Sequence, residues 1–156
     1  MKYLITNRQY NLIKENNELS FPFAIFNNDW DLVLSAMKGR PFHIQGSLNL
    51  YKSGVKSLGN LQSVEGDLNL TAAQITSLGN LQYVGHTLSL YKSNIKSLGH
   101  LISVGGDLDL FSTRIESLGN LQSVGGDLDL QHTPLSEEYF EDQIRRMVDV
   151  KREIYI

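Results

Sequence analysis

The chain has 156 residues, 41% of them hydrophobic and 20% charged, which is typical of one compact domain that buries a sizeable core. It contains no cysteine, which excludes disulfides and thiolate metal sites and indicates a reducing compartment. The start "MKYLITNRQY" lacks the pattern of a signal peptide, and no stretch approaches the ~18 consecutive apolar residues that cross a bilayer, so we expect a cytoplasmic protein without contact to a membrane.

The net charge of −3 is unevenly distributed along the chain. Residues 1–100 contain 9 Lys and Arg against 6 Asp and Glu, whereas residues 101–156 contain 5 against 11. The first part is therefore at +3 and the second at −6. This asymmetry can steer an oppositely charged partner, although a mild charge run is also typical of an ordinary solvated face.

Two helices are predicted in the N-terminal segment, residues 1–43, which we expect to cap the domain. Thr6 and Gln9 have the spacing of a capping box, which predicts a helix to about Lys14. "NNDWDLVLSAMKG" predicts a second helix that ends before Pro41. Half of the 14 aromatic residues lie here: Tyr3, Tyr10, Phe21, Phe23, Phe26, Trp30 and Phe42. We expect them to fill the cap, with a binding surface as the alternative.

The middle of the chain repeats with a period of 20 residues. Residues 48–127 read "LNLYKSGVKSLGNLQSVEGD", "LNLTAAQITSLGNLQYVGHT", "LSLYKSNIKSLGHLISVGGD" and "LDLFSTRIESLGNLQSVGGD". "IQGSLNL" from Ile44 and "LDLQHTPL" from Leu128 extend the pattern, so the repeats are predicted to begin near Pro41 and to occupy residues 44–135.

Each unit has six apolar columns, which in the second unit are Leu68, Leu70, Ile75, Leu78, Leu81 and Val84. The two leucines of L-x-L predict a short strand with alternating faces, and Gly79 interrupts any helical period. No unit can bury its apolar row alone. Stacked at the ~4.8 Å spacing of strands, the units form a solenoid with a continuous core.

This pattern resembles the leucine-rich repeat superfamily, whose units follow L-x-x-L-x-L-x-x-N-x-L, over residues 44–156. The L-x-L leucines and the next apolar residue fall on Leu108, Leu110 and Ile115 in the fourth unit. The asparagine column of the family is here Ser53, Ala73, Ser93, Thr113 and Thr133. Hydroxyl groups can still bond nearby backbone, whereas Ala73 cannot.

The resemblance implies an α/β repeat solenoid with a leucine-rich-repeat-like parallel sheet of about six short strands and helical caps at both ends. The 20-residue unit is at the short end of the family's 20–29 residues, so turns or 3₁₀ segments are expected on the convex side. The "SLGNLxxVGG" style also resembles short repeat proteins predicted in bacterial and bacteriophage genomes.

Residues 136–156 are predicted to cap the C-terminal end and to complete the single domain. Ser136 precedes "EEYFEDQIRRM", whose acids come first and whose arginines come last, which predicts a helix over Glu137–Met147. "VKREIYI" has the spacing of "VGGDLDL", which predicts a last strand over Ile154–Ile156.

Three columns of side chains are predicted to face outward from the L-x-L sheet. They are Ser47, Asp67, Thr87, Asp107 and Asp127; Asn49, Asn69, Ser89, Asp109 and Asp129; and Tyr51, Thr71, Tyr91, Phe111 and Gln131. Tyr91 and Phe111 are neighbours, with Tyr51 two units away, and exposed aromatic residues are typical anchors for a protein partner.

The acids Asp107, Asp109, Asp127 and Asp129 form a predicted two-by-two block, where each pair of like charges costs roughly 0.2–1 kcal/mol. The first column has a structural alternative, because such residues often bond a nearby turn. For the second column we expect no such structural role, so its acids are predicted to serve a partner.

Other classes of function find little support in the sequence. Motifs for phosphate, dinucleotide or zinc-protease chemistry and for a nucleophilic serine are absent, so we expect neither an enzyme nor a bound cofactor. The four acids could hold a divalent cation, but the four histidines share no metal-ligand spacing, and no metal site is predicted. Lys52, Lys56, Lys92 and Lys96 could meet phosphates, yet they are too few for nucleic acid and the acidic half would repel it.

The sequence therefore predicts a non-enzymatic module that binds a protein partner through the exposed sheet face. Its expected contact residues are Tyr51, Tyr91, Phe111, Asp107, Asp109, Asp127 and Asp129. The bacteriophage resemblance implies an inhibitor, acting in the host cytoplasm, of a defence protein with a basic groove. The alternative is a self-assembling scaffold in which the +3 and −6 regions attract head to tail; we expect a monomer or a weak homo-oligomer.

Overall fold

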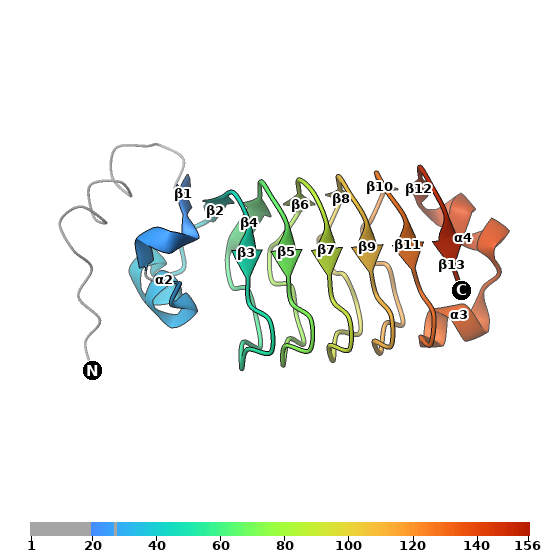
Figure 1. Cartoon of the computed structure of the whole chain (residues 1–156), viewed down its shortest axis with the longest axis horizontal. Helices are drawn as coiled ribbons and strands as arrows, with labels where there is room; N and C mark the ends of the chain where they lie inside the picture. The colour runs from blue at the N-terminus through green and yellow to red at the C-terminus, as the bar shows by residue number, and fades with distance from the viewer. Residues whose placement is uncertain (1–19, 27) are drawn as a thin grey trace.

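The computed structural model describes residues 20–26 and 28–156, which wind into a parallel β-solenoid of about four turns (Figure 1). Two sheets run along it. Sheet A has the strand order β1-β2-β4-β6-β8-β10-β12, and sheet B has the order β13-β11-β9-β7-β5-β3. The repeated apolar columns lie between them and form one continuous core.

Sheet B is the predicted L-x-L sheet. Its strands are β3 (Leu48–Asn49), β5 (Leu68–Asn69), β7 (Leu88–Ser89), β9 (Leu108–Asp109), β11 (Leu128–Asp129) and β13 (Ile154–Tyr155). Equivalent residues pair in register, as in Leu88 with Leu108. Leu88 and Leu90 are fully buried, while Ser89 between them is partly exposed. The predicted alternation, the number of about six strands and the last strand are confirmed.

Sheet A replaces the turns or 3₁₀ segments that were expected on the convex side, and that expectation is wrong. Its strands are β1 (Ser20–Pro22), β2 (Phe42–Gln45), β4 (Leu61–Val64), β6 (Tyr83–Val84), β8 (Ser103–Val104), β10 (Ser123–Val124) and β12 (Asp149–Val150). Two residues per turn are enough to pair neighbouring turns in sheet A, because backbone hydrogen bonds continue beside the strands. The Gly105 N–H donates to Val84 O and the Gly125 N–H donates to Val104 O, both at 2.8 Å. Stacking thus makes a strand from a segment that reads locally as a turn.

A glycine column beside sheet A lets the turns approach this closely. A Cβ on Gly85, Gly105 or Gly125 would overlap the backbone carbonyl oxygen of the preceding turn. The "VGG" stretch of each repeat therefore reflects contact between turns, and close backbone approach is a general reason for glycine in a strand.

A corner in the left-handed conformation follows each of the first five strands of sheet B. Its residues are Lys52, Ala72, Lys92, Ser112 and His132, with φ between 51° and 58°. The residue after each of the first four corners closes the turn through its backbone, as the Ala73 N–H does to Leu70 O at 3.0 Å. Ala73 therefore keeps the same corner as its hydroxyl-bearing counterparts, because no side-chain bond is needed.

The N-terminal end contains a 3₁₀ helix, η1 (Phe23–Phe26), and α2 (Trp30–Met37). The second predicted helix is thus confirmed; Asp29 caps it by accepting the Leu32 N–H at 3.0 Å. Aromatic packing in the core is also confirmed, with ring centroids 6.1 Å apart for Phe23 and Trp30 and 5.9 Å for Trp30 and Phe42. The predicted helix over residues 6–14, Tyr3, Tyr10 and the side chain of Phe21 lie outside the described residues.

The predicted helix Glu137–Met147 is two helices, α3 (Pro134–Glu138) and α4 (Glu141–Met147), so its predicted start and continuity are wrong. Thr133 is the N-cap instead of Ser136, because Pro134 suits the first helical position and Ser136 completes a capping box with Thr133. Tyr139 is extended, with φ −122° and ψ 145°, and interrupts the helix. The predicted acid and arginine placement holds in α4. No helix in the described part of the chain is long and apolar enough to cross a bilayer.

Candidate protein-binding surface

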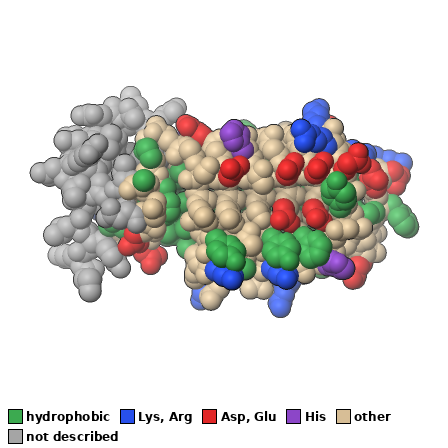
Figure 2. Space-filling model, in the orientation of Figure 1, with side chains coloured by type: hydrophobic (Ala, Val, Ile, Leu, Met, Phe, Trp, Pro, Cys, Tyr) green, Lys and Arg blue, Asp and Glu red, His purple; other side chains and the backbone are tan. Residues whose placement is uncertain are grey.

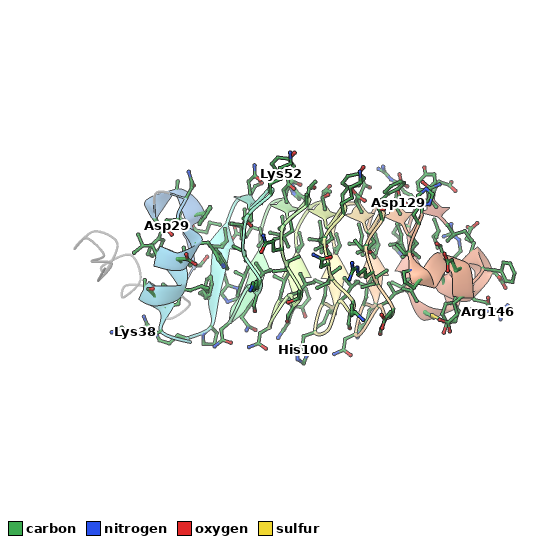
Figure 3. All side chains as sticks on the ribbon, turned by 90° about the horizontal axis from the view of Figure 1, so that it is seen from below. Asp29, Lys38, Lys52, His100, Asp129 and Arg146 are labelled. Atoms are coloured by element: carbon green, nitrogen blue, oxygen red, sulfur yellow. The ribbon has the colours of Figure 1, made fainter. Side chains whose placement is uncertain are left out.

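The outward face of sheet B, hereafter the sheet B face, carries the predicted contact residues. Figure 2 shows this face, with acidic side chains gathered over its C-terminal half next to hydrophobic ones. On sheet A, the outward column over the repeats is Ser63, Tyr83, Ser103 and Ser123, which are uncharged. Figure 3 separates the two sides, with Lys52 and Asp129 along one edge and His100 on the other. The two faces therefore differ in charge.

An aromatic cluster lies on the sheet B face where Tyr91 and Phe111 were predicted to be neighbours. Their rings stack, with centroids 5.3 Å apart and an angle of 22°. The His132 ring packs edge-on against Phe111 at 4.9 Å. Both aromatic residues remain partly exposed, so the cluster offers apolar surface to a partner.

Sequence reasoning missed His132 and the lysines beside the tyrosine rings. His132 belongs to the same corner column as Lys52 and Lys92, whose ammonium groups lie 5.0 Å from the Tyr51 and 4.9 Å from the Tyr91 ring centroid. The 20-residue period could have indicated these contacts, because each corner residue directly follows a residue of the third outward column in the sequence.

Tyr51 is not brought to the aromatic cluster. It lies two turns from Tyr91, with Thr71 in the column between them, and is 50% exposed. Its contact is with Lys52, and a hydrogen bond with the Tyr51 side chain raises the pKa of that lysine. The predicted contact set is thus a cluster at the C-terminal half plus one separate tyrosine.

The first acidic column links successive turns. Each aspartate side chain of the column accepts the backbone N–H of the equivalent residue one turn later, as Asp107 Oδ1 does from Asp127 at 2.9 Å. Asp67 accepts from Thr87 at 3.0 Å, and Asp127 accepts from Glu153 at 3.0 Å. The structural alternative considered for this column is therefore present, with the next turn of the solenoid as the bonding partner.

The second column also has a structural role, so the prediction that it has none is wrong. Asp109 Oδ1 accepts the Phe111 N–H at 3.0 Å, and Asp129 Oδ1 accepts the Gln131 N–H at 2.9 Å. Asn49 and Asn69 make the same bond two residues ahead in the first turns. This local bond is the Asx type that favours Asn and Asp before turns. It holds the backbone just before four of the five corners.

Ser89, in the same column, is part of a side-chain network. Its hydroxyl lies 2.8 Å from the Thr71 hydroxyl and donates to Asp109 Oδ2 at 3.1 Å. Both oxygens of Asp109 are therefore bonded, and this carboxylate is held in one position. A rigid charged group loses little conformational freedom when a partner binds.

Asp129 is electrostatically distinct within the acidic block. Its pKa is raised above the ordinary 3.8, chiefly because burial disfavours the charged form. The bond from the Gln131 N–H opposes the rise, the Asp109 charge adds to it, and His132 lowers the pKa. A cationic group of a partner placed here would relieve the repulsion between Asp109 and Asp129.

The arrangement does not gather ligands for a metal. Within the described residues, no group of three or more His, Asp or Glu side chains could hold a metal ion. The lysine flank considered for nucleic acid is partly engaged, since Lys96 pairs with Glu116 at 2.9 Å and Lys52 and Lys92 lie over tyrosine rings.

Comparison of the chain with known proteins gives no match among family models, curated proteins or solved structures. Function is therefore inferred from the surface itself.

Proposed function

We propose that this protein is a non-enzymatic binding module that engages a basic surface of a partner protein through the sheet B face. The observation that carries the proposal is one contiguous patch, which we name the aromatic–acidic strip. It consists of Tyr91, Phe111, Asp107, Asp109, Asp127 and Asp129.

The strip combines two features that suit protein recognition. Stacked rings offer a large apolar area with few rotatable bonds, which is typical of anchor residues at interfaces. The carboxylates beside them are ordered by backbone bonds, so they can steer a basic partner and fix its register at low entropic cost.

A narrower form of the proposal concerns the partner. The resemblance to short repeat proteins of bacterial and bacteriophage genomes supports an inhibitor that blocks a host defence protein in the bacterial cytoplasm. A basic groove for nucleic acid would complement the acidic columns of the strip. A relation to leucine-rich repeats, with α2, α3 and α4 as end caps, is part of the same proposal, supported by the L-x-L sheet.

Paired substitutions test the acidic part of the strip. Partners are captured from a bacterial lysate, and binding kinetics are then measured with Asp109→Asn/Asp129→Asn. Asn keeps the Oδ1 acceptor, as Asn49 and Asn69 show, so the fold should persist. We expect slower association and a weaker dependence on salt. Glu116→Gln, an acid outside the strip, is the matched control and should bind as the wild type does.

The aromatic part is tested with Tyr91→Ala/Phe111→Ala. Loss of the anchors should speed dissociation and leave association nearly unchanged, because anchors act after encounter by excluding water. Tyr83→Ala removes an aromatic ring that is 47% exposed on sheet A and should have no effect. If both double variants bind a partner with wild-type kinetics, the sheet B face is not the binding surface.

Self-assembly is a second candidate, favoured by one observation at the C-terminal end. Phe140, between α3 and α4, is 74% exposed, and Met147 is 49% exposed. An exposed apolar end next to uneven charge could join copies of the chain.

A further inference from the structure

A groove of about 730 Å³ lies between α2 and the corner of the first turn, at the end away from the aromatic–acidic strip. Trp30, Asp31 and Leu34 line one wall, and residues 53–57 line the other. Figure 3 shows Asp29 at the α2 end and Lys52 on the neighbouring turn. The volume lies within the roughly 300–1,000 Å³ typical of ligand sites.

The groove exists because a helix stands where later turns have a strand. β1 extends sheet A upstream of β2, but the chain between β1 and β2 forms η1 and α2 instead of a strand of sheet B. The first turn consequently lacks a stacked neighbour at its corner. Val55 remains partly exposed there, whereas Ile75, Ile95 and Ile115 in the same column are fully buried.

Several polar groups of the groove have no hydrogen-bond partner in the described part of the chain. The Trp30 Nε1 and Ser53 Oγ atoms are buried without a hydrogen-bond partner. One turn later, the Gln74 N–H donates to Ser53 O and the Thr76 N–H to Lys56 O, both at 3.0 Å. In the described part of the chain, the corresponding N–H groups of Gly54 and Lys56 have no backbone acceptor. The groove therefore offers the N–H groups of the exposed residues Gly54 and Lys56 to an extended backbone.

We propose that this groove binds an extended peptide of a partner protein, which takes the place of the missing preceding turn. Its carbonyl oxygens accept from the Gly54 and Lys56 N–H groups, and an apolar side chain covers Val55. Asp29 and Asp31 on the opposite wall favour a peptide with basic residues. Adding a strand to an open edge is a common mode of peptide recognition. This site is separate from the sheet B face and goes beyond the function proposed for it.

The chain itself supplies a probe. Residues 51–57, "YKSGVKS", make these backbone contacts to the second turn and carry two lysines. An acetylated and amidated peptide of this sequence is titrated into the full-length protein. Trp30 is the single tryptophan of the chain and lines the groove, so its fluorescence reports occupancy. We expect a saturable change in Trp30 emission.

Gly54 offers a matched pair of variants. Gly54→Ala keeps the N–H donor and fits the fold, because its Cβ would meet open space and the φ angle there is not left-handed, so it is the reference variant for loss of that donor. Gly54→Pro removes the N–H donor and should weaken binding about tenfold, the value of one hydrogen bond. Val55→Ser, which keeps the backbone, should also weaken binding and replaces Gly54→Pro if that variant does not fold.

Three outcomes would overturn the proposal. The first is the absence of any saturable change in Trp30 emission. The second is equal affinity of the Gly54→Ala, Gly54→Pro and Val55→Ser variants. The third is that the double variant Leu12→Ser/Ile13→Ser changes Trp30 emission in the absence of the probe and binds the probe more tightly than the wild type does. That result would mean that the chain's own residues 1–19 occupy the groove.

Discussion

At the scale of single residues, the acids of the sheet B face act in two ways at once. Asp109 and Asp129 hold the backbone before the corners that follow them, and Asn makes the same bond at positions 49 and 69. The bond thus requires an acceptor oxygen but no charge. The charge appears only in the later turns, beside the stacked rings, which is the reason to assign it to recognition.

The raised pKa of Asp129 makes a testable pH dependence. The folded-state pKa of Asp129 lies above the ordinary 3.8, so protonation of this group favours the folded state. Its contribution to the free energy of unfolding is fully present below pH 3.8 and is lost as the pH rises through the folded-state pKa. Asp129→Asn should therefore raise the free energy of unfolding at pH 7 by roughly 0.2–1 kcal/mol. Urea unfolding should show this gain shrinking as the pH falls through the folded pKa and vanishing below the ordinary 3.8. A gain independent of pH would show that its cause is not the charge.

The buried hydroxyl column gives a second prediction at this scale. Ser93 Oγ is buried without a partner, whereas Thr113 Oγ1 donates to Leu110 O at 2.8 Å. Ser93→Ala should leave stability unchanged or raise it by up to about 1 kcal/mol, and Ala73 already occupies the equivalent position. Thr113→Ala should cost about 1–2 kcal/mol through the lost bond and methyl contact. Equal losses for both variants would indicate that the Ser93 hydroxyl is bonded in solution.

At the scale of the elements, sheet A depends on glycine more than on strand-forming residues. Its repeated strands are short, and the carbonyl of one turn lies where a Cβ of the next would fall. Sheet B depends on its buried leucines and on the Asx bonds before four of its five corners. The two sheets of the same repeat are thus specified by different physical features.

Gly105→Ala tests this account of sheet A. The added Cβ would overlap the Gly85 carbonyl oxygen, so the turns must separate, and we expect a loss of at least about 3 kcal/mol. Gly54→Ala, where the Cβ would meet open space, should stay within about 0.5 kcal/mol of the wild type. Thermal and urea unfolding of the two variants measure the difference. Similar stabilities would mean that the turns are less closely stacked than described.

At the scale of the whole molecule, the two ends of the solenoid differ. The N-terminal end has α2 and a groove beside the first turn, and the C-terminal end has α3, α4 and an exposed Phe140. The aromatic–acidic strip lies in the C-terminal half of one face.

Sizing at low and high ionic strength distinguishes the binding module from the scaffold. If the protein is a binding module, it should be a monomer at both ionic strengths, and the Phe140→Ser variant should have the same size as the wild type. Head-to-tail assembly would give larger species at low ionic strength that dissociate as salt screens the charges. A larger species that Phe140→Ser disrupts would instead identify the apolar end as the joining surface.

The repeat period, the buried leucines of sheet B and its last strand could be predicted from the sequence. Apolar columns at a fixed spacing of 20 residues are buried only when the units stack, so the pattern leaves few alternatives. The neighbouring position of Tyr91 and Phe111 followed from the same register.

Sheet A, the break at Tyr139 and the roles of both acidic columns were decided by the tertiary structure. Sheet A forms between backbones one turn apart, and each bond of the first column joins a side-chain oxygen to a backbone N–H of the next turn, so both exist only once turns stack. The side chains of the second column bond to backbone only two residues ahead. The backbone shape that stacking imposes decides that an Oδ1 atom such as that of Asp109 points to the chain rather than to a partner. The same holds for the groove, because only the assembled first turn shows which of its donors α2 leaves without a partner.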